Sequence, residues 1–171
     1  MITYRTATLA DAPAIGLLHA KSWQQHYKEV LSETYLKNYV VEDRLEVWQL
    51  RLEKPVKNQH IILAEEQDKL CGFICLFFQE DPVWGTLLDN LHVAYDWKGK
   101  GIGASLLKAG HQWSLQQDAS IPMHLWVYAS NKGAIDFYEK LDGRVAEKTM
   151  HHNPDGGSAV ALRYVWGTSK K

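Results

Sequence analysis

The sequence predicts an α/β fold: a twisted, mixed and mainly antiparallel sheet of about six to seven strands, flanked by about four helices. Three observations carry this prediction. Segments with the period of two that is typical of strands come in pairs separated by short turns. Helical patterns alternate with strands in the second half of the chain. A strand over residues 86–93 reaches a strand over residues 123–128 through a helix, which is a parallel crossover.

The first half of the chain begins with a strand and continues with helices. The expected order is a strand over residues 2–7, a helix capped by Thr8, a second helical segment from Ser32 to near Pro55, and strands over residues 61–66 and 70–78. Thr8 is a good N-cap because its hydroxyl can accept from a free backbone N–H group. The apolar residues that follow it, from Ile15 to Trp23, recur at helical spacing.

The second half alternates between strands and helices and closes with a hairpin. The expected order is a strand over residues 86–93, a helix after the loop at 99–104, a strand over 123–128, a helix over 131–141, and strands over 144–150 and 159–166. A turn built around Pro154 and Gly156 joins the last two strands. If Tyr164 and Trp166 are exposed on the closing strands, they offer an edge for a homodimer.

Length and charge restrict the class of protein. With 171 residues, the chain fits a single domain over residues 1–171. The formal net charge of -1 gives no basic surface that would suggest nucleic acid as a partner. No apolar stretch approaches the roughly 18 residues of a membrane span, and the first residues lack the pattern of a signal peptide. We therefore expect no membrane partner and a cytoplasmic location.

The cysteines and histidines do not predict a metal site. Cys71 and Cys75 lie four residues apart in one predicted strand, about 13 Å from each other, too far for a disulfide or a shared metal. Two buried free thiols are the better interpretation. The pair His151 and His152 has no third ligand at a recognisable spacing, so a polar turn explains it better than a metal.

A glycine-rich segment is where the chemistry concentrates. The strand that ends at Val93 is followed by Gly99, Gly101 and Gly103 at the predicted start of a helix. The first turn of a helix has unpaired N–H groups, and its dipole favours an anion. Glycines let the backbone approach phosphate oxygens that a Cβ atom would keep away. The segment therefore predicts a site for a diphosphate.

The same glycines could also form a Walker loop, a dinucleotide-binding loop or a turn without a ligand. A Walker loop needs Lys followed by Ser or Thr after its last glycine, where this chain has Ala104, so it is excluded. The pattern G-x-G-x-x-G/A is met by Gly99, Gly101 and Ala104, but the next strand ends without the acidic residue that this fold uses. The dinucleotide loop and the turn without a ligand stay open on this segment alone.

The segment resembles the signature of the GNAT superfamily of N-acetyltransferases, Arg/Gln-x-x-Gly-x-Gly/Ala, preceded by a strand that ends near an apolar-x-Val. The matching residues are Lys98, Gly99, Lys100, Gly101, Ile102 and Gly103, after Leu91, His92 and Val93. Lys98 departs from the usual Arg or Gln. The resemblance implies a GNAT-like fold, acetyl-CoA as acetyl donor, and pyrophosphate contacts along the loop from Gly99 to Ala104. It also implies that the main chain of the strand end pairs with the pantetheine arm and the acetyl group.

A second segment supports this resemblance. GNAT enzymes commonly carry Asn-x-x-Ala-x-x-Phe-Tyr on the later helix, which Asn131, Ala134, Phe137 and Tyr138 match. The resemblance implies that Asn131 contacts the coenzyme arm and that the Tyr138 hydroxyl protonates the leaving thiolate. A tyrosine with a pKa near ~10 is protonated at neutral pH, as an acid must be. Taken alone, Asn131 is also a good helix cap, and Tyr138 falls on the apolar stripe of its helix.

The general base is less clear from the resemblance. The family often places an acidic residue at one of two strand positions, which hold Leu87 and Trp126 here. Asp89, two residues after Leu87 on the same strand face, is the nearest substitute, ahead of Glu80 and Asp81. Taken alone, Asp89 is better described as a solvent-facing or hydrogen-bonded strand residue than as a base.

The acceptor is expected near the first two helices, which usually set substrate specificity in this family. Trp23, His26 and Tyr27 either wall an acceptor pocket or pack the helix ends. The predicted activity is direct transfer of the acetyl group of acetyl-CoA to a primary amine of a small molecule or a peptide N-terminus, with no metal. The alternatives are a catalytically silent acyl-CoA-binding module and an interaction protein that binds no coenzyme.

Overall fold

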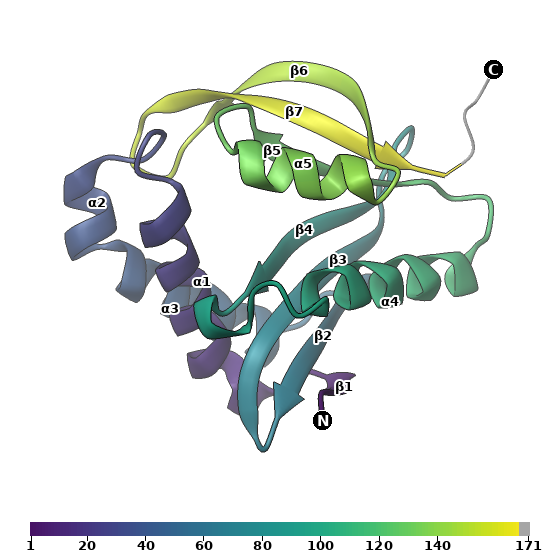
Figure 1. Ribbon diagram of the computed structural model, residues 1–171, viewed down its shortest axis with the longest axis horizontal. Helices are drawn as coiled ribbons and strands as arrows, with labels where there is room; N and C mark the ends of the chain where they lie inside the picture. Colours follow the sequence, from purple (N-terminus) through teal and green to yellow (C-terminus); the bar gives the residue numbers. More distant parts are fainter. Residues whose placement is uncertain (168–171) are drawn as a thin grey trace.

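The computed structural model describes residues 1–167, and its centre is a seven-stranded sheet in the order β1-β2-β3-β4-β5-β7-β6 (Figure 1). The strands are β1 (Thr3–Thr6), β2 (Gln59–Glu66), β3 (Lys69–Asp81), β4 (Gly85–Val93), β5 (Met123–Tyr128), β6 (Arg144–His152) and β7 (Ser158–Trp166). Within residues 1–167, β4 and β5 are the only parallel neighbours. The predicted mixed sheet with one parallel crossover is confirmed.

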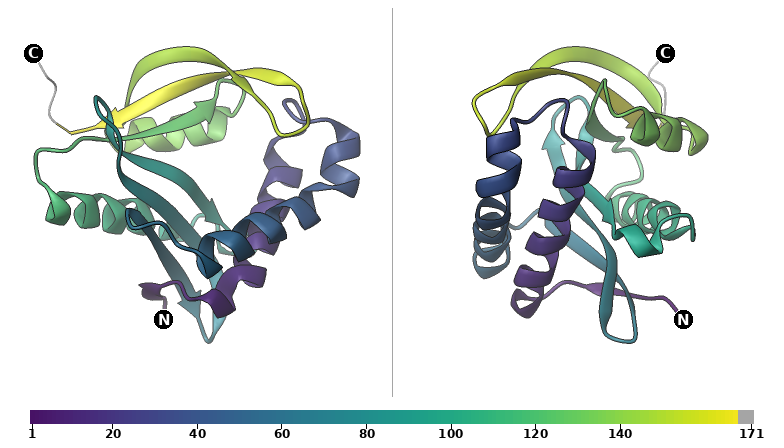
Figure 2. Two further views of the ribbon diagram at one scale, coloured as in Figure 1. Left: turned by 180° about the vertical axis from the view of Figure 1, so that it is seen from behind. Right: turned by 60° about the vertical axis from the view of Figure 1, so that its left-hand side comes forward.

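Helices cover both faces of this sheet, as Figure 2 shows. They are α1 (Ala12–His26), α2 (Glu33–Asn38), α3 (Val40–Glu53), α4 (Ile102–Gln117) and α5 (Lys132–Lys140), with short 3-10 turns η1 (Leu9–Asp11) and η2 (Tyr95–Trp97). The first three α-helices lie on one face, and α4 and α5 lie on the other. The predicted helix from Ser32 to near Pro55 is in fact two helices that meet at Tyr39. Asn38 and the β-branched pair after Tyr39 are weak helix formers, which explains the break.

The core is divided by the sheet into layers, and β3 contributes to both sides. Ile74 and Leu76 pack toward α4, whereas Phe73 and Cys75 pack toward α1 and α3 beside Trp48. This alternation follows from the two-residue period of a strand that is buried on both faces. The long apolar run of β3 is therefore the central wall of the molecule.

The two halves of the sheet separate where β4 meets β5. Only Thr86 with Met123 and Leu87 with His124 pair across this junction. After Leu87 the two strands diverge, and β5, β7, β6 and α5 form a separate upper layer in Figure 1. The edge of β4 that faces β5 is therefore unpaired along the rest of the strand, which leaves backbone N–H and C=O groups available to a ligand.

Two expectations about the closing strands are wrong. β6 continues through His151 to His152, so these histidines belong to a strand rather than a turn. Tyr164 and Trp166 are 1% and 7% exposed, and β7 lies between β5 and β6. They form no exposed homodimer edge, because Tyr164 donates to the Glu139 carboxylate and Trp166 Nε1 donates to a backbone carbonyl of the α5 end.

The remaining fold-level expectations concern the cysteines, metals and membranes. Cys71 and Cys75 are free and buried, as predicted. Among residues 1–167, no three His, Cys, Asp or Glu side chains are grouped as metal ligands would be. None of the helices in this range combines the length and the apolar character that crossing a membrane requires.

Candidate active site

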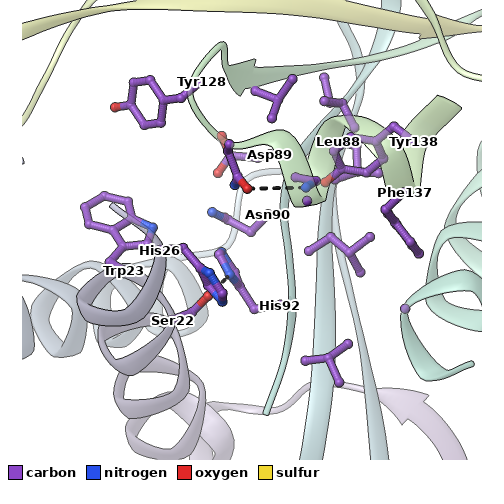
Figure 3. Close-up of a pocket in the computed structure, with 18 of the residues that line it drawn as sticks. Ser22, Trp23, His26, Leu88, Asp89, Asn90, His92, Tyr128, Phe137 and Tyr138 are labelled. Carbon is purple, nitrogen blue, oxygen red and sulfur yellow. Dashed lines mark hydrogen bonds between the residues drawn. The ribbon is translucent and has the colours of Figure 1, made fainter. Parts of the chain in front are cut away.

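A cavity of about 880 Å³ opens where β4 and β5 diverge. Its glycine-loop side consists of the free edge of β4, residues 98–104 and α5. Its aromatic side consists of the α1 end, α3, and side chains of β5 and β6. Figure 3 shows Trp23 and His26 of α1 across the cavity from Phe137 and Tyr138 of α5. The sequence-predicted residues that line the cavity are Trp23, His26, Tyr27, Asp89, Leu91, His92, Val93, Lys98, Gly99, Gly101, Ile102, Gly103, Ala104, Asn131 and Tyr138.

Lys100 is the exception among the predicted residues of the loop. It does not line the cavity, and its ammonium group lies 4.3 Å from the centre of the Trp97 ring. A cation over an aromatic face is a favourable contact that holds the side chain outside the cavity.

The loop before α4 presents backbone rather than side chains. Gly99 and Gly101 have φ of 76° and 78°, a conformation that strongly favours glycine, and a Cβ atom at either position would meet no protein atom within 4 Å. No side chain caps the start of α4. Glycine is favoured at position 103 for a different reason: a Cβ atom there would lie 3.2 Å from the Phe137 side chain of α5. The N–H groups of the first turn of α4 are thus open to an anion.

α5 brings the second predicted motif to the same cavity. The Asn131 side chain accepts a hydrogen bond from the backbone N–H of Ala134 at 3.3 Å, so it caps α5 as its helix-cap interpretation predicted. Tyr138 is 8% exposed and packs on Trp166 and Tyr164. Burial raises the pKa of Tyr138 above the usual value of a tyrosine. The hydroxyl is therefore protonated throughout the neutral range.

A β-bulge in β4 positions Asp89. Cys75 pairs with Asn90 and Leu76 pairs with Leu88, so Asp89 is the extra residue of β4. A bulge re-aims side chains at the point where it interrupts the ladder. Asp89 and Asn90 both reach Arg51 of α3, through an ion pair and a hydrogen bond of 2.8 and 2.9 Å. The predicted regular alternation from Leu87 to Asp89 is therefore interrupted.

Histidines that are held neutral lie beneath the aromatic side. His92 Nδ1 lies 2.8 Å from the Ser22 hydroxyl, a contact visible in Figure 3. His19 accepts a hydrogen bond from Trp48 Nε1 at 2.8 Å. Burial, with the nearby charges of His26, Lys98 and Arg44, lowers the pKa of His92 to about 3. Burial also lowers the pKa of His19 well below its usual value.

His26 connects the two sides of the cavity. Its Nε2 accepts from the Lys98 ammonium group at 2.5 Å. Burial and then the positive charge of Lys98 lower the pKa of His26, so the ring is neutral and can accept this bond. His26 therefore lies at the start of the glycine loop rather than within the aromatic wall.

Aromatic rings close the far end of the cavity. Trp23 and Tyr27 have ring centres 5.6 Å apart, and Tyr27 lies edge-on to Tyr128 at 5.0 Å. The Tyr128 hydroxyl donates to Asn153 Oδ1 at 2.8 Å, and Asn153 Nδ2 donates to the carbonyl of Val30 at 2.8 Å. The turn between β6 and β7 is thus joined to the segment between α1 and α2.

A second hydrogen bond reinforces this junction. The Asp155 carboxylate accepts from the backbone N–H of Ser32 at 2.7 Å. The backbone hydrogen bonds from Ser32 and Gly157 lower the pKa of Asp155, so the carboxylate stays ionised. Two turns that are more than a hundred residues apart in the chain therefore act as one rigid support behind the aromatic rings.

Several cavity residues were not predicted from the sequence, chiefly on α3, β5 and β6. They include Ser22, Arg44, Arg51, Asn90, Tyr128 and His151. Arg44 and Arg51 are seven residues apart and share a helix face with Trp48, so helical spacing could have identified them. Tyr128 and His151 had no such signal, because only the tertiary fold brings them to the cavity.

Comparison with known proteins identifies the family. The acetyltransferase (GNAT) family matches residues 20–143. The chain is 27% identical over 149 residues to an uncharacterized N-acetyltransferase, YuaI, of Bacillus subtilis (strain 168), a match that covers 86% of this chain and 83% of that protein. It is 30% identical over 87 residues to an uncharacterized N-acetyltransferase, MJ1207, of Methanocaldococcus jannaschii, which covers 46% of this chain and 36% of that one.

Solved structures agree with this match at the level of the fold. The PaiA N-acetyltransferase of Thermoplasma acidophilum, solved in complex with coenzyme A, superposes with a TM-score of 0.72 at 18% identity, covering 97% of this chain and 99% of that chain. A GCN5-related N-acetyltransferase of Rhodopseudomonas palustris gives a TM-score of 0.76 at 16% identity, with coverage of 97% and 95%. Because the family match spans both predicted motifs and most of the chain, the protein belongs to the acetyltransferase (GNAT) family.

Proposed function

We propose that this protein transfers the acetyl group of acetyl-CoA directly to a primary amine, of a small molecule or of a peptide N-terminus, without a covalent enzyme intermediate. The observation that carries the proposal is the divergence of β4 from β5 beside an uncapped helix start. The thioester supplies the activated acetyl group. The chain itself must bind the donor, orient the amine and manage two protons.

The glycine loop suits the pyrophosphate of the coenzyme. Gly99 and Gly101 leave open space above the backbone, and the first-turn amides of α4 are free. Hydrogen bonds from such amides to a charged group are worth ~1.5–3 kcal/mol each. We assign the anion contacts to the main chain of residues 99–104, with Lys98 adding a positive charge nearby.

The free edge of β4 suits the pantetheine arm, which carries amide groups. An extended segment can pair with an open strand edge through main-chain hydrogen bonds. We assign this pairing to the backbone of Leu91, His92 and Val93, with Asn131 at the start of α5 facing the same arm. The arm would then take the place that β5 vacates beyond Leu87.

Tyr138 is assigned as the proton donor to the departing thiolate. Tyr138 lines the cavity, and its raised pKa keeps the proton in place until charge develops on the sulfur. A positioned acid of this kind contributes about 10²–10⁴-fold to a rate.

Asp89 is assigned as the group that receives the proton of the amine. Only a neutral amine attacks a carbonyl, and a lysine-like amine with a pKa of ~10.4 is almost fully protonated at pH 7. Asp89 is the only carboxylate among the described cavity-lining residues. Trp23 and Tyr27 supply the apolar wall for the acceptor.

The ion pair between Asp89 and Arg51 favours a second candidate function. At 2.8 Å this pair occupies the carboxylate, which would leave a module that binds acyl-CoA without transferring the acyl group. Both candidates require coenzyme binding, and only the first requires release of a thiol.

The test is calorimetric titration with acetyl-CoA, followed by measurement of free thiol with a panel of amines. Saturable binding to one site and amine-dependent thiol release are expected. Binding with no thiol release from any amine would replace the enzyme by the silent module. Absence of binding to folded protein would overturn both.

A further inference from the structure

We propose that the acceptor is a small amine that also carries a carboxylate, and that Arg44 on the aromatic side binds this carboxylate. The inference rests on the proposed acetyl transfer and names its class of acceptor. It is carried by the contacts of Arg44, by the charges that line the cavity and by the closure of its far end.

The guanidinium of Arg44 is fixed by two contacts and still has an N–H donor without a partner among the described residues. Its side chain is 12% exposed, and the guanidinium lies 4.4 Å from the centre of the Trp23 ring. One nitrogen donates to the Asp43 carboxylate at 3.1 Å. The Nε atom is buried and has no hydrogen-bond partner among the described residues. Nη1 donates to no described residue either, and unlike Nε it is not enclosed by protein, so it is the donor that Arg44 can offer to an anion in the cavity.

The charges of the cavity favour an acceptor with an anionic group. The side chains that line it include three cations, Arg44, Arg51 and Lys98, and a single carboxylate, Asp89, within residues 1–167. Arg51 is neutralised by Asp89, and Lys98 lies at the glycine loop beside His26. Arg44 is also paired, with the Asp43 carboxylate, but Asp43 does not line the cavity, so Arg44 is the cation that the aromatic side presents to a ligand. A polyamine would find one carboxylate there, whereas the planar fork of an arginine fits a carboxylate well.

The closed far end limits the length of the acceptor. Tyr27 and Tyr128 meet edge to face at 5.0 Å, and Asn153 fixes Tyr128 to the carbonyl of Val30 behind them. The two turns therefore back the cavity on this side, which favours a short acceptor over a peptide. Trp23, Tyr27 and Tyr128 offer an apolar surface on which the side chain of a free amino acid can pack.

The test measures recognition separately from turnover. Wild-type protein is titrated calorimetrically, with and without coenzyme A, with N-acetyl derivatives of phenylalanine, leucine and alanine, and with the primary amide of each. At least one acid should bind about tenfold or more tightly than its amide, because a charge-assisted hydrogen bond replaces a neutral one. Arg44→Gln should remove the difference, and Arg44→Lys should retain part of it.

Lys37→Gln is the matched control, since it removes an exposed positive charge on α2 that lies outside the cavity. It should leave the preference for the acid unchanged. Equal binding of acid and amide, no binding of any acid, or a preference that survives in Arg44→Gln would overturn the inference. Coenzyme binding to Arg44→Gln shows that the variant is folded.

Thiol release with the matching free amino acids, their amides, spermidine and a tripeptide then separates the two proposals. Selective binding of the acids with no thiol release retains the recognition site and removes the transfer. Thiol release that is equal for amino acid, amide and spermidine retains the transfer and removes the role of Arg44.

Discussion

The glycine-loop side of the cavity presents mainly backbone groups, whereas the aromatic side presents side chains. The first is built from two local motifs, in which glycines and a helix start expose amide groups. The second draws Trp23, Arg44, Tyr128 and His151 from segments spread over the whole chain. Backbone recognition tolerates sequence change, so a family can keep its donor site. Side-chain recognition changes with every substitution, so the acceptor can differ between members.

The largest expected effect is on coenzyme binding at the glycine-loop side of the cavity. Gly101→Glu places a bulky anion in the loop at φ 78°, and we expect it to weaken acetyl-CoA binding by at least about 10³-fold, through lost amide contacts and charge repulsion. Calorimetric titration measures this. Gly156→Glu is the control, because it imposes the same side chain on a glycine of similar φ in the turn between β6 and β7. Equal weakening in both variants would show that strain, not phosphate contact, is responsible.

Removal of the Tyr138 hydroxyl separates an effect on kcat from an effect on coenzyme binding. Tyr138→Phe should lower kcat by about 10²-fold and leave coenzyme affinity nearly unchanged, because a proton donor acts only as the thiolate departs. Steady-state thiol release gives both parameters. Tyr164→Phe removes a neighbouring hydroxyl that donates to Glu139 and does not line the cavity. It should keep the wild-type kcat, and a kcat of wild-type size in Tyr138→Phe would remove the assigned role.

Substitution of Asp89 tests the assigned proton acceptor, which lies where the two sides of the cavity meet. Asp89→Asn should lower kcat/KM by about 10- to 100-fold at pH 7, and the deficit should shrink as rising pH deprotonates the amine without help. The pH–rate profile from pH 6 to 10 measures this. Asp81→Asn is the control, because Asp81 lies at the end of β3 outside the cavity lining. A deficit that stays constant with pH would indicate a positioning effect through Arg51 instead.

The smallest expected effect is a loss of folding stability at acidic pH that depends on His92. The pKa of His92 is about 3 in the folded protein, below the ~6.5 of an unfolded histidine, so the unfolded state binds more protons between these values. The free energy of unfolding should therefore fall by about 2 kcal/mol between pH 7 and pH 5. Denaturant titrations at both pH values measure it. His92→Gln should reduce the loss, whereas replacement of the exposed His152 should not.

The same division explains what could be predicted from the sequence. The succession of strands and helices along the chain, the glycine loop and the α5 motif follow from local patterns, and the structure brings Gly101 and Tyr138 to one cavity as expected. The break at Tyr39 and the bulge at Asp89 depend on tertiary packing, which local propensity does not contain. The burial of Tyr164 was not predicted, because nothing in the local pattern shows that β7 lies inside the sheet rather than at its edge.

The junction between Asn153 and Val30 has a consequence for synthesis of the chain. These residues are 123 positions apart, so the acceptor end of the cavity cannot form until Asn153 has left the ribosome. Contacts of such long range are also the slowest to form in folding. The β4 edge and the glycine loop come earlier in the chain, so a nascent chain can carry this part of the donor site before it has anywhere to hold an acceptor.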